Sequence, residues 1–289
     1  MAYVYLNGEI LPEEAARVGV NDRSILFGDA AYETMRSYGG RFFRFPDHLD
    51  RLRHTVQGMG LTLPFDDEAI TGGATALLEK NGMPDARLRL TLTGGRHEGA
   101  IRLARPHPPN LILASFPLPP LDPALTRDGA EVLVSPWRVH SDSPLPRIKT
   151  VNRLVHLMAK EEAIGRGAYE SLFLDEAGGI LEGTATNVFF VLEGALVTPG
   201  LDAPLLPGVT RDVVLSLARE AGMTVREETV GLERAKSASE AFLTGSTIEL
   251  LPVRSLDGAR IGDGRPGTVW RDLAERYRAV VARETGTPA

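Results

Sequence analysis

The 289-residue sequence contains no cysteine, which excludes disulfides, thiolate metal sites and cysteine nucleophiles. It has no apolar run long enough to span a bilayer, and its first residues lack the basic and apolar regions of a signal peptide. The formal net charge of -6 provides no broad basic field for nucleic acid or an anionic membrane. We therefore expect a cytoplasmic protein that binds neither nucleic acid nor membrane.

The sequence patterns of several other enzyme classes are also missing. No Gly-x-Gly-x-x-Gly follows an early strand, as a dinucleotide-binding domain requires, and Gly262-Asp263-Gly264 near the end does not supply it. The Gly-x-Ser-x-Gly of serine hydrolases is absent. The six histidines are scattered, so we expect no metal site.

The composition is that of an ordinary globular protein, with 43% hydrophobic and 24% charged residues. The length favours two domains. Proline clusters at residues 117–123, which we predict to be the linker between a smaller N-terminal α/β domain (1–116) and a larger domain with a β-rich core (124–289). The expected fold class is thus α/β, or more loosely α+β. Asn7-Gly8 predicts a tight turn between short strands at residues 3–6 and 9–11, an N-terminal hairpin. Residues 87–93 alternate so regularly that they predict a strand.

Lys149 stands between a proline-broken loop (141–146) and a run with helical periodicity, which predicts a helix from Val151 to about Ile164. The apolar stripe of this helix would be formed by Val151, Leu154, Val155 and Met158. A lysine on such a rigid element, influenced by Arg147 and Arg153, is suited to Schiff-base chemistry. The alternative is a solvated lysine at a helix start.

Two further charged residues have both an ordinary and a functional interpretation. Glu182 lies among apolar strand ends, so it is either exposed or faces a buried cation, and a protonated pyridine nitrogen would serve. Arg51 lies beside the apolar stripe, formed by Leu49, Leu52 and Val56, of a helix predicted to begin at about Pro46. It is either a surface arginine or an inward guanidinium that clamps a phosphate or carboxylate.

Two stretches have the form of anion cradles. Residues 205–211 lead through Gly208 into a predicted helix, whose first N–H groups and dipole favour an anion, although Thr210 is equally suited to cap that helix. Residues 243–247 end an apolar strand in hydroxyl side chains. A lysine, an isolated carboxylate and two cradles together indicate one phosphorylated ligand.

These residues occur in motifs that run in one order over nearly the whole chain. The motifs are Tyr5-Leu6-Asn7-Gly8, Phe27-Gly28-Asp29, His48-Leu49-Asp50-Arg51-Leu52, Ile148-Lys149-Thr150-Val151-Asn152, Glu182-Gly183 and Gly208-Val209-Thr210-Arg211. In this respect the chain resembles the class IV, fold type IV family of enzymes that depend on pyridoxal 5'-phosphate (PLP). That family contains D-amino-acid transaminases, branched-chain transaminases and aminodeoxychorismate lyase.

The resemblance implies roles for individual residues. Lys149 would hold PLP as a Schiff base and, once released, would carry a proton to and from the substrate. Glu182 would pair with the pyridine nitrogen, and Leu206 would lie against the ring. The phosphate would be held by Arg51, Val209, Thr210, Ser246 and Thr247. The resemblance further implies a homodimer acting on small amino acids and 2-oxo acids, such as 2-oxoglutarate or pyruvate.

Substrate residues are harder to assign. Tyr32 resembles the tyrosine that faces substrate in D-amino-acid transaminases. The carboxylate trap of those enzymes is an arginine with a histidine two positions later, whereas Arg96 and His97 are adjacent in this sequence. Arg89 resembles the arginine that branched-chain transaminases use for the substrate carboxylate. For each arginine the alternative is a solvated charge.

Three activities remain open within the family, and we rank D-amino-acid transamination first. Branched-chain or broad-range transamination is second. The lyase, which releases pyruvate without an amino acceptor, is third. It is favoured by Asn152-Arg153-Leu154, which matches its Lys-x-x-Asn-Arg-Leu pattern, whereas branched-chain enzymes usually have a tyrosine where Arg153 stands.

Overall fold

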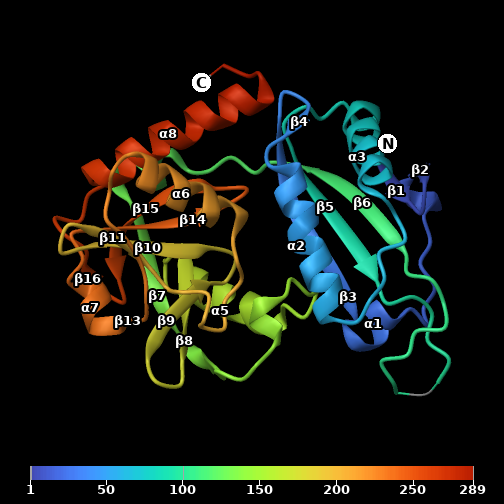
Figure 1. Cartoon of the computed structure of the whole chain (residues 1–289), viewed down its shortest axis with the longest axis horizontal. Helices are drawn as coiled ribbons and strands as arrows, with labels where there is room; N and C mark the ends of the chain where they lie inside the picture. Colours follow the sequence, from blue (N-terminus) through green and yellow to red (C-terminus); the bar gives the residue numbers. More distant parts are fainter. Residues whose placement is uncertain (1, 100, 289) are drawn as a thin grey trace. The chain divides into compact units, whose positions relative to one another are not determined.

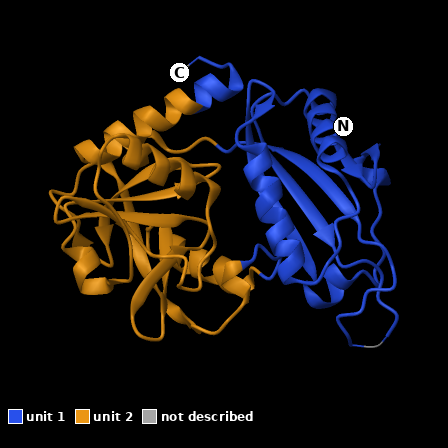
Figure 2. Ribbon diagram, viewed as in Figure 1, with its two compact units in different colours: residues 1–119, 148–152, 281–288 blue, residues 120–147, 153–280, 289 orange. Residues whose placement is uncertain are grey.

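A computed structural model describes residues 2–99 and 101–288. The chain forms two compact units, shown in different colours in Figure 2. Unit 1 comprises the chain up to Pro119 together with Ile148–Asn152 and Val281–Pro288, and unit 2 comprises Pro120–Arg147 and Arg153–Val280. The ranges predicted from sequence did not anticipate that the short segment around Lys149 belongs with the N-terminal part of the chain.

Unit 1 contains a six-stranded sheet in the order β2-β1-β6-β5-β3-β4, in which all neighbours are antiparallel. The strands are β1 (Tyr3–Leu6), β2 (Glu9–Pro12), β3 (Ala30–Tyr38), β4 (Arg41–Phe42), β5 (Ala86–Thr93) and β6 (Leu111–Pro117). Asn7 and Gly8 both have positive φ, as a tight hairpin turn between β1 and β2 requires. The predicted N-terminal hairpin and the strand at residues 87–93 are confirmed.

Helices of unit 1 pack on this sheet, and Figure 1 shows α2 running along β3 and β5. The helical segments are η1 (Glu13–Ala15), α1 (Arg23–Phe27), α2 (Phe45–Gly58) and α3 (Asp67–Asn81). The core contains the predicted α2 stripe of Leu49, Leu52 and Val56. Asp66 caps α3 by accepting the N–H of Ala69 at 2.7 Å.

The two faces of β3 and β5 have different characters, because successive side chains on a strand point to opposite faces. Met35 and Leu88 are opposite one another in the register and belong to the core under α2 and α3. Tyr32, Thr34 and Arg89 lie on the other face, with Thr34 directly opposite Arg89. The sheet of unit 1 therefore carries its candidate substrate residues on the face that the helices do not cover.

Unit 2 is built on a ten-stranded sheet with the path β12-β11-β10-β14-β15-β7-β8-β9-β13, and β16 pairs with β15. The strands are β7 (Ala130–Val139), β8 (Glu170–Asp175), β9 (Gly179–Gly183), β10 (Asn187–Leu192), β11 (Ala195–Thr198), β12 (Val225–Glu227), β13 (Val230–Gly231), β14 (Glu240–Gly245), β15 (Glu249–Leu256) and β16 (Ala259–Arg260). Every residue of β10 is buried, which explains why its sequence after Asn187 is continuously apolar.

The helical segments of unit 2 are α4 (Pro123–Asp128), η2 (Leu145–Arg147), α5 (Leu154–Gly165), α6 (Val209–Glu220) and α7 (Leu232–Lys236), and the last helix of the chain is α8 (Thr268–Thr285). Pro123, predicted to end the linker, is instead the first residue of α4, which Asp122 caps by accepting the N–H of Ala124. None of the helices in the described part of the chain is both long and apolar enough to cross a membrane.

The helix after Lys149 differs from the prediction. It begins at Leu154 rather than Val151, and its buried residues are Ala159 and Ala163. Leu154 and Met158, predicted to form its apolar stripe, are exposed. Their spacing does place apolar side chains on one face of α5, but that face is exposed rather than packed against β7 and β8 of the same unit.

Candidate active site

The backbone of residues 149–151 lies as a short added strand along the start of β3. The N–H of Lys149 donates to the Oγ1 of Thr55 on α2 at 3.1 Å, and its carbonyl accepts the N–H of Tyr32 at 2.9 Å. The N–H of Val151 donates to the carbonyl of Ala30 at 3.1 Å. β4 pairs with only the last two residues of β3, so the segment at Lys149 covers the other end of that edge. Lys149 thus has a rigid mount, although it is a strand edge and not the predicted helix start.

Tyr32 has both Lys149 and Arg89 beside its ring. The Nζ of Lys149 is 4.8 Å from the ring centroid, and the guanidinium carbon of Arg89 is 3.4 Å from it. The tyrosine is 6% exposed, and both cations are within the range of attraction to an aromatic face. Arg89 also donates from Nε to the Oγ1 of Thr91 at 3.3 Å. Two predicted substrate residues therefore lie with the predicted nucleophile.

Arg51 is engaged with a buried carboxylate that sequence reasoning missed. Its Nε and Nη2 donate to the two oxygens of Glu33 at 2.8 and 2.7 Å, and His48 Nδ1 lies 2.8 Å from Glu33 Oε2. Burial alone would raise the pKa of Glu33, but the charge and hydrogen bonds of Arg51, aided by His48, hold it well below its usual range. Glu33 is therefore a carboxylate, and Arg51 is an inward guanidinium rather than a surface one.

His48 completes this cluster as a neutral donor. Burial lowers its pKa, and although the hydrogen bond and charge of Glu33 oppose that effect, the charges of Arg51 and Lys149 reinforce it. Because Glu33 is ionised and can only accept, the proton of the imidazole sits on Nδ1 and points to that carboxylate.

Glu182, in unit 2, is buried on β9 with 8% of its surface exposed. Its Oε2 accepts the N–H of Leu206 at 3.1 Å. Of the two interpretations that the sequence allowed, exposure is therefore excluded. The same hydrogen bond fixes the backbone of Leu206, the residue expected to lie against the cofactor ring.

The first candidate cradle is the N-terminus of α6. Gly208 is its N-cap residue and Thr210 is already helical, so the alternative role of Thr210 as the cap is wrong. A Cβ on Gly208 would clash with the Oδ1 of Asn187, whose Nδ2 donates to the carbonyl of Leu206 at 3.0 Å. Asn187, which the sequence did not single out, therefore fixes a close approach that only glycine permits. Val209 and Thr210 are both buried at this helix start.

The second cradle is the turn between β14 and β15. Ser246 and Thr247 lie in this turn and are half-buried. The N–H of Ile248 donates to the carbonyl of Gly245 at 3.2 Å, and Glu249 adopts positive φ as β15 begins. A tight turn of this kind presents backbone N–H groups and hydroxyls together, which suits an anion.

The two arginines that flank Lys149 in sequence have other tasks. Arg147 donates from Nη1 to the carbonyls of Leu201 and Ala203 at 3.1 and 2.9 Å, and from Nη2 to that of Asp202 at 2.8 Å. Arg153 donates to the carbonyl of Thr184. Both guanidiniums therefore tie loops of unit 2 in place, and the expectation that they influence the lysine amine is not supported by these contacts.

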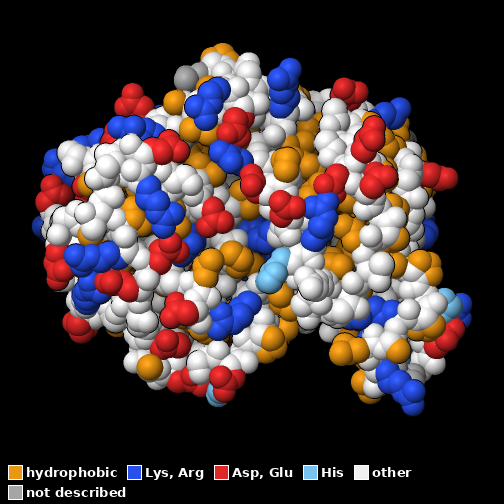
Figure 3. Space-filling model, in the orientation of Figure 1, with side chains coloured by type: hydrophobic (Ala, Val, Ile, Leu, Met, Phe, Trp, Pro, Cys, Tyr) orange, Lys and Arg blue, Asp and Glu red, His pale blue; other side chains and the backbone are white. Residues whose placement is uncertain are grey.

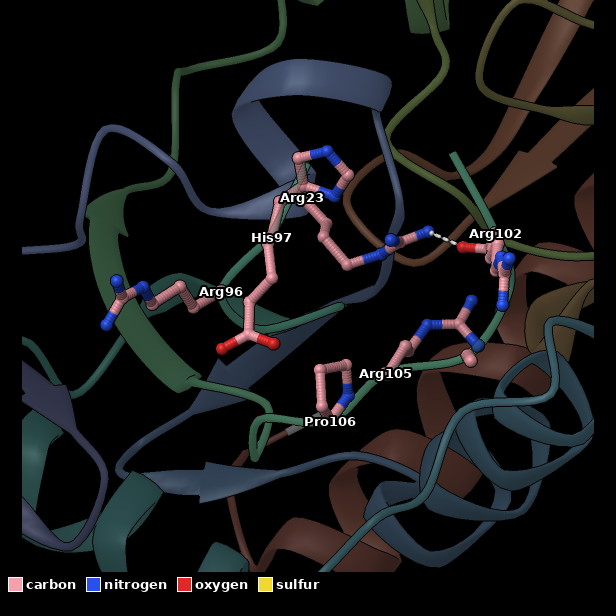
Figure 4. Close-up of a pocket in the computed structure, with 8 residues that line it drawn as sticks. Arg23, Arg96, His97, Arg102, Arg105 and Pro106 are labelled. Atoms are coloured by element: carbon pink, nitrogen blue, oxygen red, sulfur yellow. Dashed lines mark hydrogen bonds between the residues drawn. The ribbon is translucent and has the colours of Figure 1, made fainter. Parts of the chain in front are cut away.

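Arg96 and His97 line a cavity of about 360 Å³ in unit 1, shown in Figure 4. Arg23, Arg102 and Arg105 also line it, together with the acidic Glu98. In Figure 4 the side chain of Arg96 points away from those of Arg23 and Arg105. The cavity is rich in guanidinium groups, which suits an anionic ligand.

Asp29 anchors this cavity and was not recognised from the sequence, although it belongs to a quoted motif. Arg23 donates to it from Nε at 2.6 Å, and Arg105 donates from Nη2 at 2.7 Å. Burial opposes ionisation, but hydrogen bonds from Arg105 and Arg23 hold the pKa of Asp29 below its ordinary value. Arg105 also donates to the carbonyls of Met59 and Gly60, so it joins the loop to the end of α2.

The residue types present fit PLP. Unit 1 offers an anchored lysine and an oriented arginine. Unit 2 offers a buried carboxylate, a helix start that only glycine permits, and a hydroxyl-bearing turn. An aldehyde, a pyridine nitrogen and a phosphate monoester require these donor types.

Comparison with known proteins agrees with this fit. Residues 30–256 match the family described as amino-transferase class IV. A putative branched-chain-amino-acid aminotransferase of Methanocaldococcus jannaschii is 34% identical, with 96% of each chain covered. The D-alanine aminotransferase of Staphylococcus epidermidis is 29% identical, with 97% of this chain and 98% of that protein covered.

A solved structure supports the same assignment. A branched-chain amino acid aminotransferase complexed with N-(5'-phosphopyridoxyl)-L-glutamate, from the organism abbreviated T.th., has a TM-score of 0.90 and 27% identity, covering 99% of this chain and 95% of that one. The expectations of a two-domain fold type IV architecture and of PLP as the cofactor are thereby confirmed. The protein belongs to the class IV amino-transferases and uses pyridoxal 5'-phosphate.

Proposed function

We propose that this enzyme transfers an amino group between a branched-chain L-amino acid and a 2-oxo acid such as 2-oxoglutarate. The observation that carries this proposal is the position of Arg89 on the ring of Tyr32, beside Lys149. A guanidinium fixed there can bind a substrate carboxylate through two parallel hydrogen bonds. The name of the Methanocaldococcus jannaschii relative supports the same substrate class.

The proposed roles at the cofactor follow from the contacts of each residue. When bound, PLP supplies an electron sink for the bonds at the substrate α-carbon. Lys149 moves the proton at that carbon, because its backbone is fixed while its amine remains on a flexible stem. Glu182 holds the pyridine nitrogen in its protonated form. The phosphate is bound by Arg51, Val209, Thr210, Ser246 and Thr247, and Leu206 contacts the ring.

Transamination of D-amino acids is the second candidate. The cavity lined by Arg96 and His97 favours it, because Arg96 and Arg102 line this cavity in addition to the two arginines that pair with Asp29, and a guanidinium can bind a substrate carboxylate. The Staphylococcus epidermidis relative, named a D-alanine aminotransferase, supports the same alternative. Pyruvate release by a lyase has weaker support. Arg153 belongs to the sequence pattern that favours the lyase, but its guanidinium donates a hydrogen bond to the backbone carbonyl of Thr184.

A homodimer is part of the proposal. α5 presents an apolar face to solvent within unit 2, where Leu154 is 70% and Leu157 is 61% exposed, and Val155, Met158 and Ile164 are exposed with them. On the face seen in Figure 3, acidic, basic and hydrophobic side chains are interspersed. A second copy of the chain is the occupant that the family favours. Light scattering gives the molar mass of Leu157→Glu and of the unchanged protein over a range of concentrations, and the variant is expected to dissociate more readily. A variant that dimerises as strongly as the unchanged protein would show that α5 does not form the dimer contact.

Single-turnover spectroscopy distinguishes the activities. L-leucine, D-alanine and D-glutamate are added separately to the PLP form, and conversion of its visible band to the pyridoxamine form is followed. Fastest conversion with L-leucine is expected. Fastest conversion with a D-amino acid would favour D-amino-acid transamination, with the Arg96 cavity as the candidate site for the substrate carboxylate. Persistence of the band with every amino acid would favour the lyase, which is then tested by pyruvate release.

A further inference from the structure

Glu33 breaks the pattern of the strand that carries it. On β3 the residues Ala31 and Met35 face the helices and belong to the core, and Glu33 lies between them in that alternation. It is fully buried, with 0% exposure. A buried carboxylate is costly unless it is paired and hydrogen-bonded, so an apolar residue would be more favourable for stability alone.

The partners of Glu33 orient one guanidinium. Arg51 uses Nε and Nη2 on the two carboxylate oxygens, a planar fork that fixes the guanidinium in one orientation. His48, one helical turn earlier on α2, donates to the same carboxylate. An anion that binds Arg51 must therefore meet the edge of the guanidinium that faces away from Glu33.

The same face of α2 also fixes the nucleophile. Thr55 follows Arg51 by four residues, so the two side chains are neighbours on the helix, and Thr55 accepts the N–H of Lys149. Arg51 and Lys149 are thus positioned from one rigid element. Because Glu33 holds Arg51 from the adjacent strand, the orientation of Arg51 is tied to the strand edge on which Lys149 is mounted.

We propose that Glu33 is a positioning residue for the cofactor phosphate. By holding the guanidinium of Arg51 in one orientation, it raises the affinity of the protein for the phosphate group of PLP. This inference rests on the proposed role of Arg51 in binding that phosphate. A carboxylate with only a structural role would affect folding, and it would affect ligands with and without phosphate equally.

The test compares PLP with pyridoxal, which lacks the phosphate. Each is titrated into the cofactor-free protein, and the ratio of the pyridoxal dissociation constant to the PLP dissociation constant measures the contribution of the phosphate. Glu33→Gln is expected to lower that ratio by about tenfold, the effect of one oriented charge-assisted contact, and to leave the pyridoxal constant unchanged. Arg51→Gln should lower the ratio further, and adding Glu33→Gln to it should have no additional effect.

Asp29→Asn is the control for loss of stability in unit 1, because Asp29 is also a carboxylate between arginines of that unit, but its partners are Arg23 and Arg105. It should leave the ratio unchanged. If Glu33→Gln does not fold, Glu33→Asp replaces it; the shorter side chain keeps the charge but loses the two-point contact, so a smaller loss is expected. An unchanged ratio in the folded Glu33 variant, with a lowered ratio in Arg51→Gln, overturns the inference alone. An unchanged ratio in Arg51→Gln overturns the phosphate role of Arg51 as well.

Discussion

The guanidinium carbon of Arg89 lies 3.4 Å from the centroid of the Tyr32 ring, and the amine of Lys149 lies near the same ring. Arg89 projects from β5 and Tyr32 from β3, on the face of the sheet opposite the helices. A tyrosine shared by two cations in this way links the predicted nucleophile to one particular arginine.

Replacement of Arg89 tests this link. Arg89→Gln should lower kcat/KM for L-leucine by about 100-fold, because a two-point charged contact to the carboxylate is lost. Arg87→Gln is the matched control, since Arg87 is on the same strand face but stacks on Phe116. Steady-state kinetics of both variants measure the difference. Equal losses of kcat/KM in the two variants would mean that the overall positive charge of this face, rather than a specific contact from Arg89, promotes the reaction.

Replacement of Lys149 by alanine should abolish turnover, because the group that moves the proton is removed. The backbone contacts of residue 149 do not depend on its side chain, so the fold should persist. Activity assays and circular dichroism provide the two measurements. Normal turnover in this variant would refute the mechanism.

Glu182→Gln should leave cofactor binding largely intact and slow the half-reaction, because the glutamine cannot stabilise a protonated ring nitrogen. Its amide can still accept the N–H of Leu206, which limits structural change. Stopped-flow absorbance gives the rate of the half-reaction. A rate equal to that of the unchanged enzyme would remove Glu182 from its proposed role.

Asp29→Asn should destabilise unit 1 by about 3 kcal/mol, because two largely buried guanidiniums lose their counter-charge. Chemical unfolding followed by circular dichroism measures the change. Asp50→Asn, which removes an exposed partner of Arg53, should change stability by less than about 0.5 kcal/mol. Similar values for the two variants would show that burial of the Asp29 cluster contributes little.

The Glu33 cluster predicts acid sensitivity. The pKa of His48 is lowered in the folded protein, so below about pH 6.5 the unfolded chain binds more protons and the free energy of unfolding falls. The pKa of Glu33 is also lowered, and its contribution is lost as the pH falls further, below about 4.3. Urea unfolding from pH 7 to 3 should show both effects. His48→Gln should flatten the curve between about pH 6.5 and 5; an identical curve would contradict the assigned cause.

The sequence by itself determined the elements with strong local signals and the residue types of the site. The Asn7-Gly8 hairpin, the leucine alternation of β5 and the α2 stripe depend on backbone preferences and periodicity, which neighbouring residues carry. Lys149, Glu182 and the Gly208 helix start could be chosen as candidates because their chemistry is unusual for their surroundings.

Tertiary structure decided which of those side chains meet. Lys149 sits on a strand edge because Thr55 and Tyr32, distant in sequence, supply its backbone partners. Glu33 is ionised only because Arg51 and His48 are beside it, and Asn187 determines why residue 208 must be glycine. These contacts join residues far apart in the chain, and periodicity within one segment carries no information about them. Hydrogen bonds and charge pairing between segments are properties of the folded chain alone.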